Sequence, residues 1–214
     1  MLLDRRNSLL FDFDGTIADS PALHEAAFRA VLRETQPELL ERFRYRDVLG
    51  METTLVFRQL GIAENKIAYC TAAKRKAYAD YLSGGHLKFM PGAAECLNEL
   101  AGMGCDLYIA TSGSRGSVTA ALEALGVVDA FHGMVTSTDV THGKPAPDIF
   151  QKLLRDFSIA PEEAVVIEDA LSGVIAARAA GLPVIGVYNR DLEGVADIYL
   201  AGLCDLPGLL QAHA

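Results

Sequence analysis

The chain of 214 residues is long enough for one large domain, or for a domain with a smaller insert. Half of its residues are apolar, so a hydrophobic core is expected, and its formal net charge of -9 argues against a surface for nucleic acids or anionic membranes. No apolar stretch approaches the roughly 20 residues of a membrane-spanning helix, and no signal peptide is recognisable. The four cysteines lack metal-binding spacing, which indicates free thiols in a reducing cytoplasm.

The first element expected along the chain is a buried strand, residues 8–13, whose end carries two aspartates and a glycine. Side chains two residues apart on a strand point the same way, so Asp12 and Asp14 can converge on one point. Burying two charged carboxylates is unfavourable, and a divalent cation such as Mg²⁺ would offset the penalty. The alternative is an ordinary Asp-Gly turn with both carboxylates in water.

A helical stretch follows this strand and extends to the glycine-rich break at residues 83–85. Pro21 occupies the first position of an amphipathic helix, whose apolar stripe runs from Ala22 to Val31. Three further helices are expected at residues 38–48, 53–60 and 65–82.

Helices and strands alternate from Pro91 onward, which predicts a parallel sheet with helices on both faces, a Rossmann-like α/β core. The expected strands are residues 106–110, 133–137, 164–167, 183–187 and 198–200. The expected helices are residues 93–103, 116–125, 147–157 and 171–180. A ligand site in such a sheet lies beyond the carboxyl ends of the strands.

The spacing of the first two strands predicts an inserted subdomain. Asp14 and Thr111 stand at the ends of these two strands and are 97 residues apart, whereas a complete strand–helix–strand unit needs only about 30 residues. We therefore expect residues 17–83 to form a helical cap, and residues 1–16 with 84–214 to form the α/β core.

Two further stretches follow expected strands. The turn of Thr111, Ser112 and Gly113 enters a helix, and its backbone N–H groups would suit a phosphate. An ordinary helix cap is the alternative. Lys144 lies in a loop whose backbone is restricted by two prolines, and a surface lysine is the simpler interpretation of that residue alone.

A second acidic pair, Glu168 and Asp169, ends the buried strand expected at residues 164–167. Two acidic pairs at the ends of two buried strands are hard to reconcile with ordinary turns, because each pair would face the same unfavourable desolvation. The repetition favours a metal site.

Together these stretches resemble the haloacid dehalogenase (HAD) superfamily over essentially the whole chain. The nucleophile motif DxDGT matches residues 12–16, and the hydroxyl, lysine and acidic-pair motifs match Thr111, Lys144 and Glu168-Asp169. The helical insert after the first motif is similar to the cap of the group that contains beta-phosphoglucomutase and small sugar-phosphate phosphatases.

The resemblance implies that Asp12 attacks phosphorus and forms an aspartyl-phosphate. A carboxylate with an ordinary pKa is already ionised at neutral pH, so Asp12 would need no base. Asp14 is implied as the acid that protonates the leaving alcohol and the base that then activates water.

The resemblance also implies the ligands of Mg²⁺ and of the phosphate. Asp12, the Asp14 carbonyl and Asp169 would hold the metal, and Glu168 would orient the metal's surroundings through water. The implied phosphate-binding residues are Gly15, Thr111, Ser112, Gly113 and Lys144.

Hydrolase and mutase differ at the cap. His24 and Lys76 match cap positions of beta-phosphoglucomutase and are expected at the substrate, with a solvated helix residue and an exposed lysine as the alternatives. Where that mutase has an arginine three residues after a cap glycine, this chain has Thr53 after Gly50. Without the arginine, the second phosphate of a bisphosphate lacks its clamp. We therefore expect a phosphatase for a sugar phosphate or similar metabolite, with the mutase as the alternative.

Two other classes stay open at this point. The superfamily contains metal-free dehalogenases, but Asp14 and the Glu168-Asp169 pair favour the metal-dependent phosphotransferases. A catalytically idle relative could bind phosphate as a sensor, although every motif position is occupied. A monomer is the default, with a small phosphorylated metabolite as partner and neither nucleic acid nor membrane.

Overall fold

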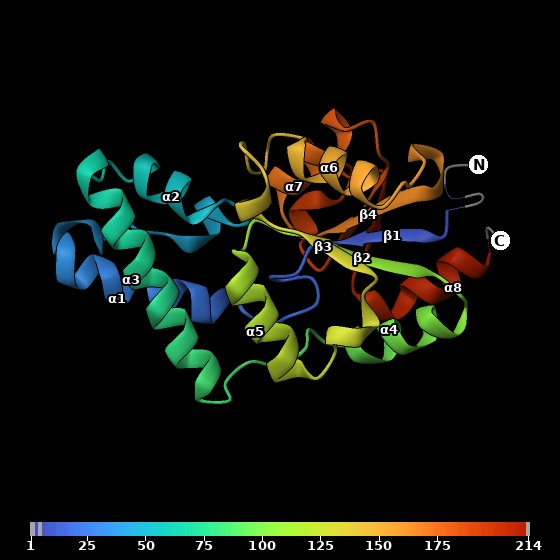
Figure 1. Ribbon diagram of the computed structural model, residues 1–214, viewed down its shortest axis with the longest axis horizontal. Helices are drawn as coiled ribbons and strands as arrows, with labels where there is room; N and C mark the ends of the chain where they lie inside the picture. Colours follow the sequence, from blue (N-terminus) through green and yellow to red (C-terminus); the bar gives the residue numbers. More distant parts are fainter. Residues whose placement is uncertain (1–2, 4–5, 213–214) are drawn as a thin grey trace.

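The computed structural model describes residue 3 and residues 6–212. Its strands form one parallel sheet in the order β3-β2-β1-β4-β5-β6 (Figure 1). The strands are β1 (Ser8–Phe11), β2 (Asp106–Ala110), β3 (Gly133–Val135), β4 (Ala164–Glu168), β5 (Val184–Val187) and β6 (Ile198–Leu200). β1 lies between β2 and β4, with Phe11 opposite Ile109 and Ile167. The predicted α/β class is confirmed.

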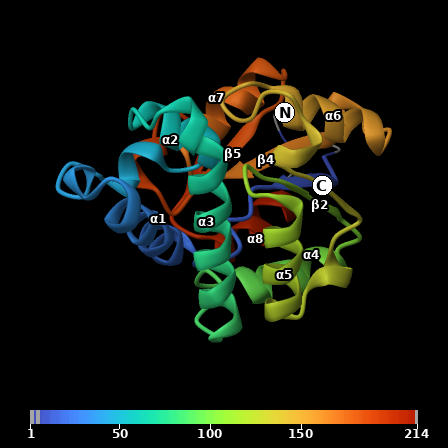
Figure 2. The ribbon, with the colours of Figure 1, turned by 60° about the vertical axis from the view of Figure 1, so that its left-hand side comes forward.

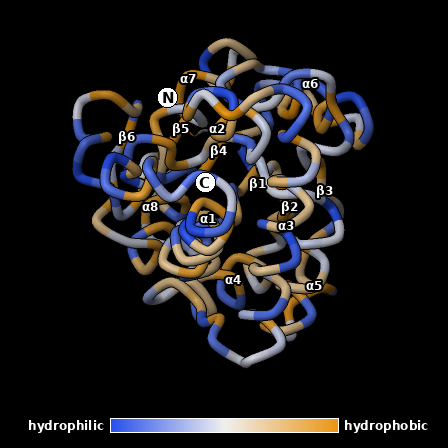
Figure 3. The backbone as a smooth tube through the Cα atoms, turned by 90° about the vertical axis from the view of Figure 1, so that its left-hand side faces the viewer, coloured by the Kyte–Doolittle hydropathy of each residue, from blue (hydrophilic) through white to orange (hydrophobic). Residues whose placement is uncertain are grey.

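Helices cover both faces of this sheet (Figure 1). One face carries α4 (Ala93–Gly102), α5 (Arg115–Leu125) and α8 (Leu206–Gln211), and the other carries α6 (Asp148–Asp156) and α7 (Leu171–Ala179). Leu9 and Phe11 pack into the first hydrophobic cluster, whereas Leu10 packs into the second. Strands buried on both faces are apolar throughout, and Figure 3 accordingly colours the backbone around β4 and β5 as hydrophobic.

The remaining helices form a lobe at one end of the sheet. They are α1 (Pro21–Thr35), α2 (Thr53–Gln59) and α3 (Glu64–Ser83). Phe28, Val56 and Ile67, one from each helix, belong to a third hydrophobic cluster confined to this lobe. α3 continues beside α5 (Figures 1 and 2), and its last turns contribute to the sheet's own core. The lobe is therefore packed internally and also attached to the sheet.

The expected helix at residues 38–48 is wrong. The segment contains two short 3-10 helices, Pro37–Leu39 and Tyr45–Val48. Leu39, Phe43 and Val48 are buried in the lobe's cluster, and their spacing of four and five residues imitates a helical stripe. The expected strands 8–13 and 133–137 end earlier, and α8 was not predicted.

The four cysteines carry free thiols, of which Cys70 and Cys96 are buried and Cys204 is exposed. Within the described residues, no helix is both long enough and apolar enough to cross a bilayer.

Candidate active site

The loop that leaves β1 turns sharply and separates Asp12 from Asp14. The backbone N–H of Asp12 donates to Ile167 O at 2.9 Å, which keeps the loop beside β4 for one more residue. Gly15 follows with a φ of +87°, and a Cβ atom there would lie 2.3 Å from Asp169 Oδ2. Only glycine fits this position, because a side chain would be strained and would displace the Asp169 carboxylate.

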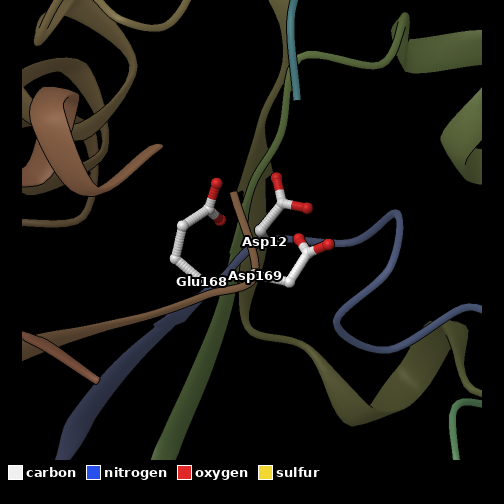
Figure 4. Close-up of side chains that lie close together, drawn as sticks. All are labelled: Asp12, Glu168 and Asp169. Atoms are coloured by element: carbon white, nitrogen blue, oxygen red, sulfur yellow. The ribbon is translucent and has the colours of Figure 1, made fainter. Parts of the chain in front are cut away.

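Three carboxylates meet where β1 and β4 end (Figure 4). Asp12 follows β1, while Glu168 and Asp169 stand at the end of β4, the neighbouring parallel strand. One oxygen of each carboxylate lies within 4.8 Å of the others, and all three side chains are buried. Hard oxygen ligands gathered in this way suit Mg²⁺.

A glycine also makes room for Glu168. A Cβ atom at Gly173, in the first turn of α7, would lie 1.7 Å from Glu168 Oε1. That oxygen is buried and has no hydrogen-bond partner among the described residues, so it can accept a water or another ligand. Gly173 was not predicted as a site residue, because its importance comes from the close approach of α7 to β4.

Lys144 is fully buried between Asp12 and Glu168. Its Nζ atom lies 2.7 Å from Asp12 Oδ1 and 3.4 Å from Glu168 Oε2. Burial alone would lower the pKa of Lys144, but the two carboxylates raise it above its ordinary value. The ammonium therefore stays charged and in contact with Asp12, and the surface-lysine interpretation is wrong.

The three carboxylates of the acidic cluster have raised pKa values. Burial raises the pKa of Asp12, and Lys144 opposes this only in part. Burial and the charge of Asp12 likewise hold the pKa values of Glu168 and Asp169 well above their ordinary range. The expectation of an ordinary pKa for Asp12 is therefore wrong for the protein without a bound metal, because several acids are buried close together. A divalent cation fits this cluster, since its charge would favour the ionised form of every carboxylate.

The Asp14 carboxylate turns away from this cluster. Its Oδ1 atom accepts a hydrogen bond from Ser20 Oγ at 2.5 Å and lies 2.9 Å from His24 Nε2. Burial alone would raise the pKa of Asp14, but His24 and Ser20 lower it to about 2. Ser20 precedes α1 and binds Asp14 instead of capping the helix. Asp14 is thus an ionised carboxylate at neutral pH.

A second buried lysine completes this side of the site. Lys74 Nζ lies 2.6 Å from His24 Nδ1, and the His24 ring stacks on Tyr78 with 4.1 Å between centroids. Burial lowers the pKa of Lys74 to about 8, against the opposing effect of Asp14. His24 is therefore a buried residue of the site, and not a solvated helix residue.

Lys76 is not part of the site. Its side chain is 77% exposed, and its Nζ atom lies 2.9 Å from Asp80 Oδ2, one turn along α3. Residues two apart on a helix differ in direction by about 200°, so Lys74 and Lys76 face opposite sides. The prediction that Lys76 meets the substrate is wrong.

The turn after β2 lies beside Asp14. Thr111 is buried, and its Oγ1 atom accepts a hydrogen bond from the Gly113 N–H at 3.0 Å. A Cβ atom at Gly113 would lie 3.6 Å from Asp14 Oδ2. The Ser112 hydroxyl donates to Gly50 O at 2.8 Å and ties the lobe to the sheet. Backbone N–H groups are the donors that this turn can offer a phosphate.

These residues line a cleft between the lobe and the carboxyl ends of the strands. The cleft has two adjoining parts, an inner part that Asp12 lines and an outer part that reaches Ser114 and Ser117. Asp12, Thr111 and Tyr45 line the inner part. Asp14, His24, Thr53, Lys74, Ser112 and Gly113 line both parts. The cleft thus brings the strand-end motifs together with side chains of the lobe.

Lys74 and Tyr45 are among the residues of this cleft that were not predicted. Cys70, Lys74 and Tyr78 follow one another at intervals of four on α3, and all are buried. That period is visible in the sequence and distinguishes Lys74 from Lys76. Tyr45 belongs to a short 3-10 helix and to no motif, so the sequence carries no comparable signal for it.

The chain has relatives among known proteins. The sequence model of the haloacid dehalogenase-like hydrolases matches residues 9–187. Protein CbbY of Cereibacter sphaeroides is 33% identical over 217 residues, which cover 94% of this chain and 94% of that protein. The validoxylamine A 7'-phosphate phosphatase of Streptomyces hygroscopicus subsp. limoneus is 28% identical over 92% of this chain and 94% of its own length.

A solved structure shares the whole architecture. CbbY from Rhodobacter sphaeroides, in a complex with xylulose-(1,5)bisphosphate, is 29% identical with a TM-score of 0.80. The match covers 94% of this chain and 96% of that chain, so it includes the helical lobe as well as the sheet. The family match spans every strand-end motif described above. The chain therefore belongs to the family of haloacid dehalogenase-like hydrolases.

Proposed function

We propose that this protein is a Mg²⁺-dependent phosphatase that hydrolyses a small phosphorylated metabolite through an aspartyl-phosphate on Asp12. The observation that carries the proposal is the buried ammonium of Lys144, 2.7 Å from Asp12 Oδ1 and next to two further carboxylates. A fixed cation beside a carboxylate nucleophile suits phosphoryl transfer, because negative charge spreads over the oxygens of the transferring group.

Asp12 is the nucleophile in this proposal. Its carboxylate attacks phosphorus while the bond to the ester oxygen breaks on the opposite side. Lys144 and the Thr111 hydroxyl bind the phosphoryl oxygens. The backbone N–H groups near Gly15 and Gly113 add further donors, and neither glycine obstructs the approach of the phosphate.

Asp14 is the acid and then the base. With its pKa near 2 in the free protein, it receives its proton only when a bound phosphate adds negative charge nearby. The protonated carboxyl group protonates the leaving alcohol, and the resulting carboxylate then takes a proton from the water that attacks the aspartyl-phosphate. The Ser20 hydroxyl donates to this carboxylate at 2.5 Å, and His24 Nε2 lies 2.9 Å from it, so both residues restrict its orientation.

Asp12, Asp169 and the backbone carbonyl of Asp14 would hold Mg²⁺, with Glu168 acting through a water. When bound, the ion would offset the repulsion between the carboxylate nucleophile and the anionic phosphate. The shared position of the acids and the unpartnered Glu168 Oε1 support this fit.

We assign residues 17–83 to a cap and residues 1–16 with 84–214 to the catalytic core. The lobe's own hydrophobic cluster supports this division. The lobe also contributes His24 and Lys74 to the cleft. A cap in this position would keep bulk water from the reacting phosphate while it is bound.

A sugar phosphate or a similar phosphomonoester is the proposed substrate. The validoxylamine A 7'-phosphate phosphatase and the CbbY complex with xylulose-(1,5)bisphosphate both involve phosphorylated polyhydroxyl compounds. The outer cleft is lined by hydroxyl side chains, which suit such a leaving group: Thr53, Ser112, Ser114, Ser117 and Ser137. The free thiols are compatible with the proposed cytoplasmic location.

A phosphosugar mutase has less support. Thr53 lines both parts of the cleft, and its single neutral hydroxyl cannot clamp the second phosphate of a bisphosphate as a forked guanidinium would. A metal-free dehalogenase has less support as well, because it would have no use for the buried cluster around Asp169.

The test is a measurement of inorganic phosphate released from a panel of phosphorylated metabolites, with Mg²⁺ or with EDTA. We expect Mg²⁺-dependent release from at least one sugar phosphate, without a bisphosphate activator. Beta-glucose 1-phosphate is assayed with and without glucose 1,6-bisphosphate. Bisphosphate-dependent formation of glucose 6-phosphate with little free phosphate would establish the mutase instead. Absence of Mg²⁺-dependent turnover of every ester, p-nitrophenyl phosphate included, would refute the proposal.

A further inference from the structure

Tyr45 lines the inner cleft and has no role in the chemistry described so far. It begins the 3-10 helix Tyr45–Val48 of the lobe. Its ring lies 6.3 Å from the His24 ring and 6.0 Å from the Phe28 ring, centroid to centroid. Its hydroxyl forms no hydrogen bond with any residue that the structure describes. The cleft therefore contains a half-buried aromatic ring whose hydroxyl has no partner among the described residues.

Tyr45 lines the same part of the cleft as the catalytic carboxylates of Asp12 and Asp14. Burial, followed by the negative charges of Asp14, Asp169 and Asp12, raises the pKa of Tyr45 well above its ordinary value. The phenol is therefore protonated at neutral pH and can donate one hydrogen bond. Asp14, the proposed acid for the leaving alcohol, lines the same part of the cleft as Tyr45, so a hydrogen bond from the hydroxyl can reach the leaving group there.

The segment that carries Tyr45 is tied to the sheet. The Ser112 hydroxyl donates to Gly50 O at 2.8 Å, and the Ser172 hydroxyl donates to Leu49 O at 3.4 Å. The first bond comes from the turn after β2, which also carries Thr111, and the second comes from the first turn of α7. A donor on a segment anchored in this way is held in place before the substrate arrives, and it loses little freedom on binding.

We propose that Tyr45 determines substrate specificity by donating a hydrogen bond to an oxygen on the carbon next to the phosphoester carbon. This inference rests on the phosphatase function proposed above. It selects esters with a neighbouring hydroxyl or carbonyl oxygen, as in sugar and polyol phosphates, over plain alkyl phosphates. When an ester without that oxygen binds, the phenol hydroxyl loses its water and gains no hydrogen-bond partner. Sites built to bind a polar group discriminate strongly against analogues that lack it.

The test uses two substrates that differ by one oxygen, propane-1,2-diol 1-phosphate and n-propyl phosphate. We expect wild-type kcat/KM to favour the diol ester by about tenfold or more. Tyr45→Phe should lower kcat/KM for the diol ester by about the same factor and leave n-propyl phosphate within about twofold. Phenylalanine keeps the ring contacts with His24 and Phe28, so the variant should remain folded, as circular dichroism will show.

Tyr69→Phe is the matched control, because Tyr69 also belongs to the lobe but is 55% exposed and binds Glu34 Oε1 at 2.8 Å. Tyr69→Phe should leave kcat/KM unchanged for both esters. An equal loss on both esters in Tyr45→Phe would overturn the inference, and so would an unchanged preference or a wild-type enzyme without preference. Assays of p-nitrophenyl phosphate with Mg²⁺, run in parallel, distinguish a failure of the Tyr45 proposal from a failure of the phosphatase proposal. If this ester is hydrolysed but the diol ester and n-propyl phosphate are not distinguished, only the role of Tyr45 is rejected. If no ester is hydrolysed, the phosphatase function itself is rejected.

Discussion

The ammonium of Lys74 lies 2.6 Å from Nδ1 of His24, although the two residues are 50 positions apart in the sequence. Burial lowers the pKa of His24, so the ring is neutral at pH 7. Because Lys74 donates to Nδ1, the proton of the neutral ring is on Nε2, which lies 2.9 Å from Asp14 Oδ1. A lysine of α3 thus sets the tautomer of the imidazole that orients the catalytic carboxylate.

Lys74→Ala should therefore reduce kcat/KM for the best substrate by about 10²-fold, because Asp14 loses its oriented partner. Lys76→Ala is the matched control two residues away, and it should stay within about twofold, since an exposed ion pair contributes little. Steady-state kinetics of both variants checks this. Similar losses in the two variants would contradict the placement of Lys74 at the site.

The pH dependence of activity should follow Lys74. Its pKa is about 8, so kcat/KM should fall as the pH rises through about 8 and the ammonium loses its charge. The pH–rate profile of Lys74→Met, which has no charge to lose, should lack this alkaline decline. A decline of the same size in both proteins would assign it to another group.

The contribution of Lys74 to stability should increase with pH, whereas its contribution to activity decreases. The pKa of Lys74 is lowered from 10.5 to about 8 on folding, so between these values the unfolded chain binds more protons than the folded protein. The contribution of Lys74 to the free energy of unfolding therefore increases with pH across this range. Urea unfolding of wild type and Lys74→Met at pH 8 and pH 10 should show a steeper increase in the wild type.

Asp12→Asn should lower turnover by at least about 10³-fold, because the amide keeps the shape of the carboxylate but cannot form the phosphoenzyme. The far-ultraviolet circular dichroism spectrum should be unchanged. Acid quenching with a radiolabelled phosphoester should trap labelled wild-type protein and no labelled variant. Near-wild-type turnover would refute Asp12 as the nucleophile.

Asp14→Asn should keep Mg²⁺ binding while turnover collapses. The Asp14 carboxylate is engaged by Ser20 and His24 and lies outside the acidic cluster, so the metal would use only the backbone carbonyl. Calorimetric titration with Mg²⁺ beside a kinetic assay tests this. Loss of metal binding in the folded variant would show that the carboxylate itself is a ligand.

Mg²⁺ should stabilise the wild type and not Asp169→Asn. The pKa of Asp169 is raised well above 3.8, so above pH 3.8 the folded protein holds a proton that the unfolded chain has released. Without metal, this group's contribution to stability therefore decreases as the pH rises through that window. Mg²⁺ at pH 7.5 should reverse the effect and raise the thermal midpoint in proportion to its binding. An equal increase in both proteins would place the metal elsewhere.

The residues at strand ends were predictable because of their neighbours in the chain. Asp12 and Glu168-Asp169 each end an apolar run, and the ends of neighbouring parallel strands meet at one edge of a sheet. The alternation of helices and strands predicts the parallel sheet, whereas the structure shows that β1 and β4 are neighbours in it. Lys144 could be singled out only by its motif, and its burial between two acids became visible only in three dimensions.

The sequence by itself determined the α/β class and the strand ends where the acidic pairs stand, because periodicity and buried charge are local properties of the chain. The period of Cys70, Lys74 and Tyr78 singles out one face of α3 in the sequence, but only the tertiary structure showed that this face turns to the cleft and leaves Lys76 exposed. The tertiary structure also decided the direction of each pKa shift at Asp12 and Asp14. Those shifts depend on burial and on partners distant in the sequence, and no local pattern encodes how much water a folded chain removes from a carboxylate.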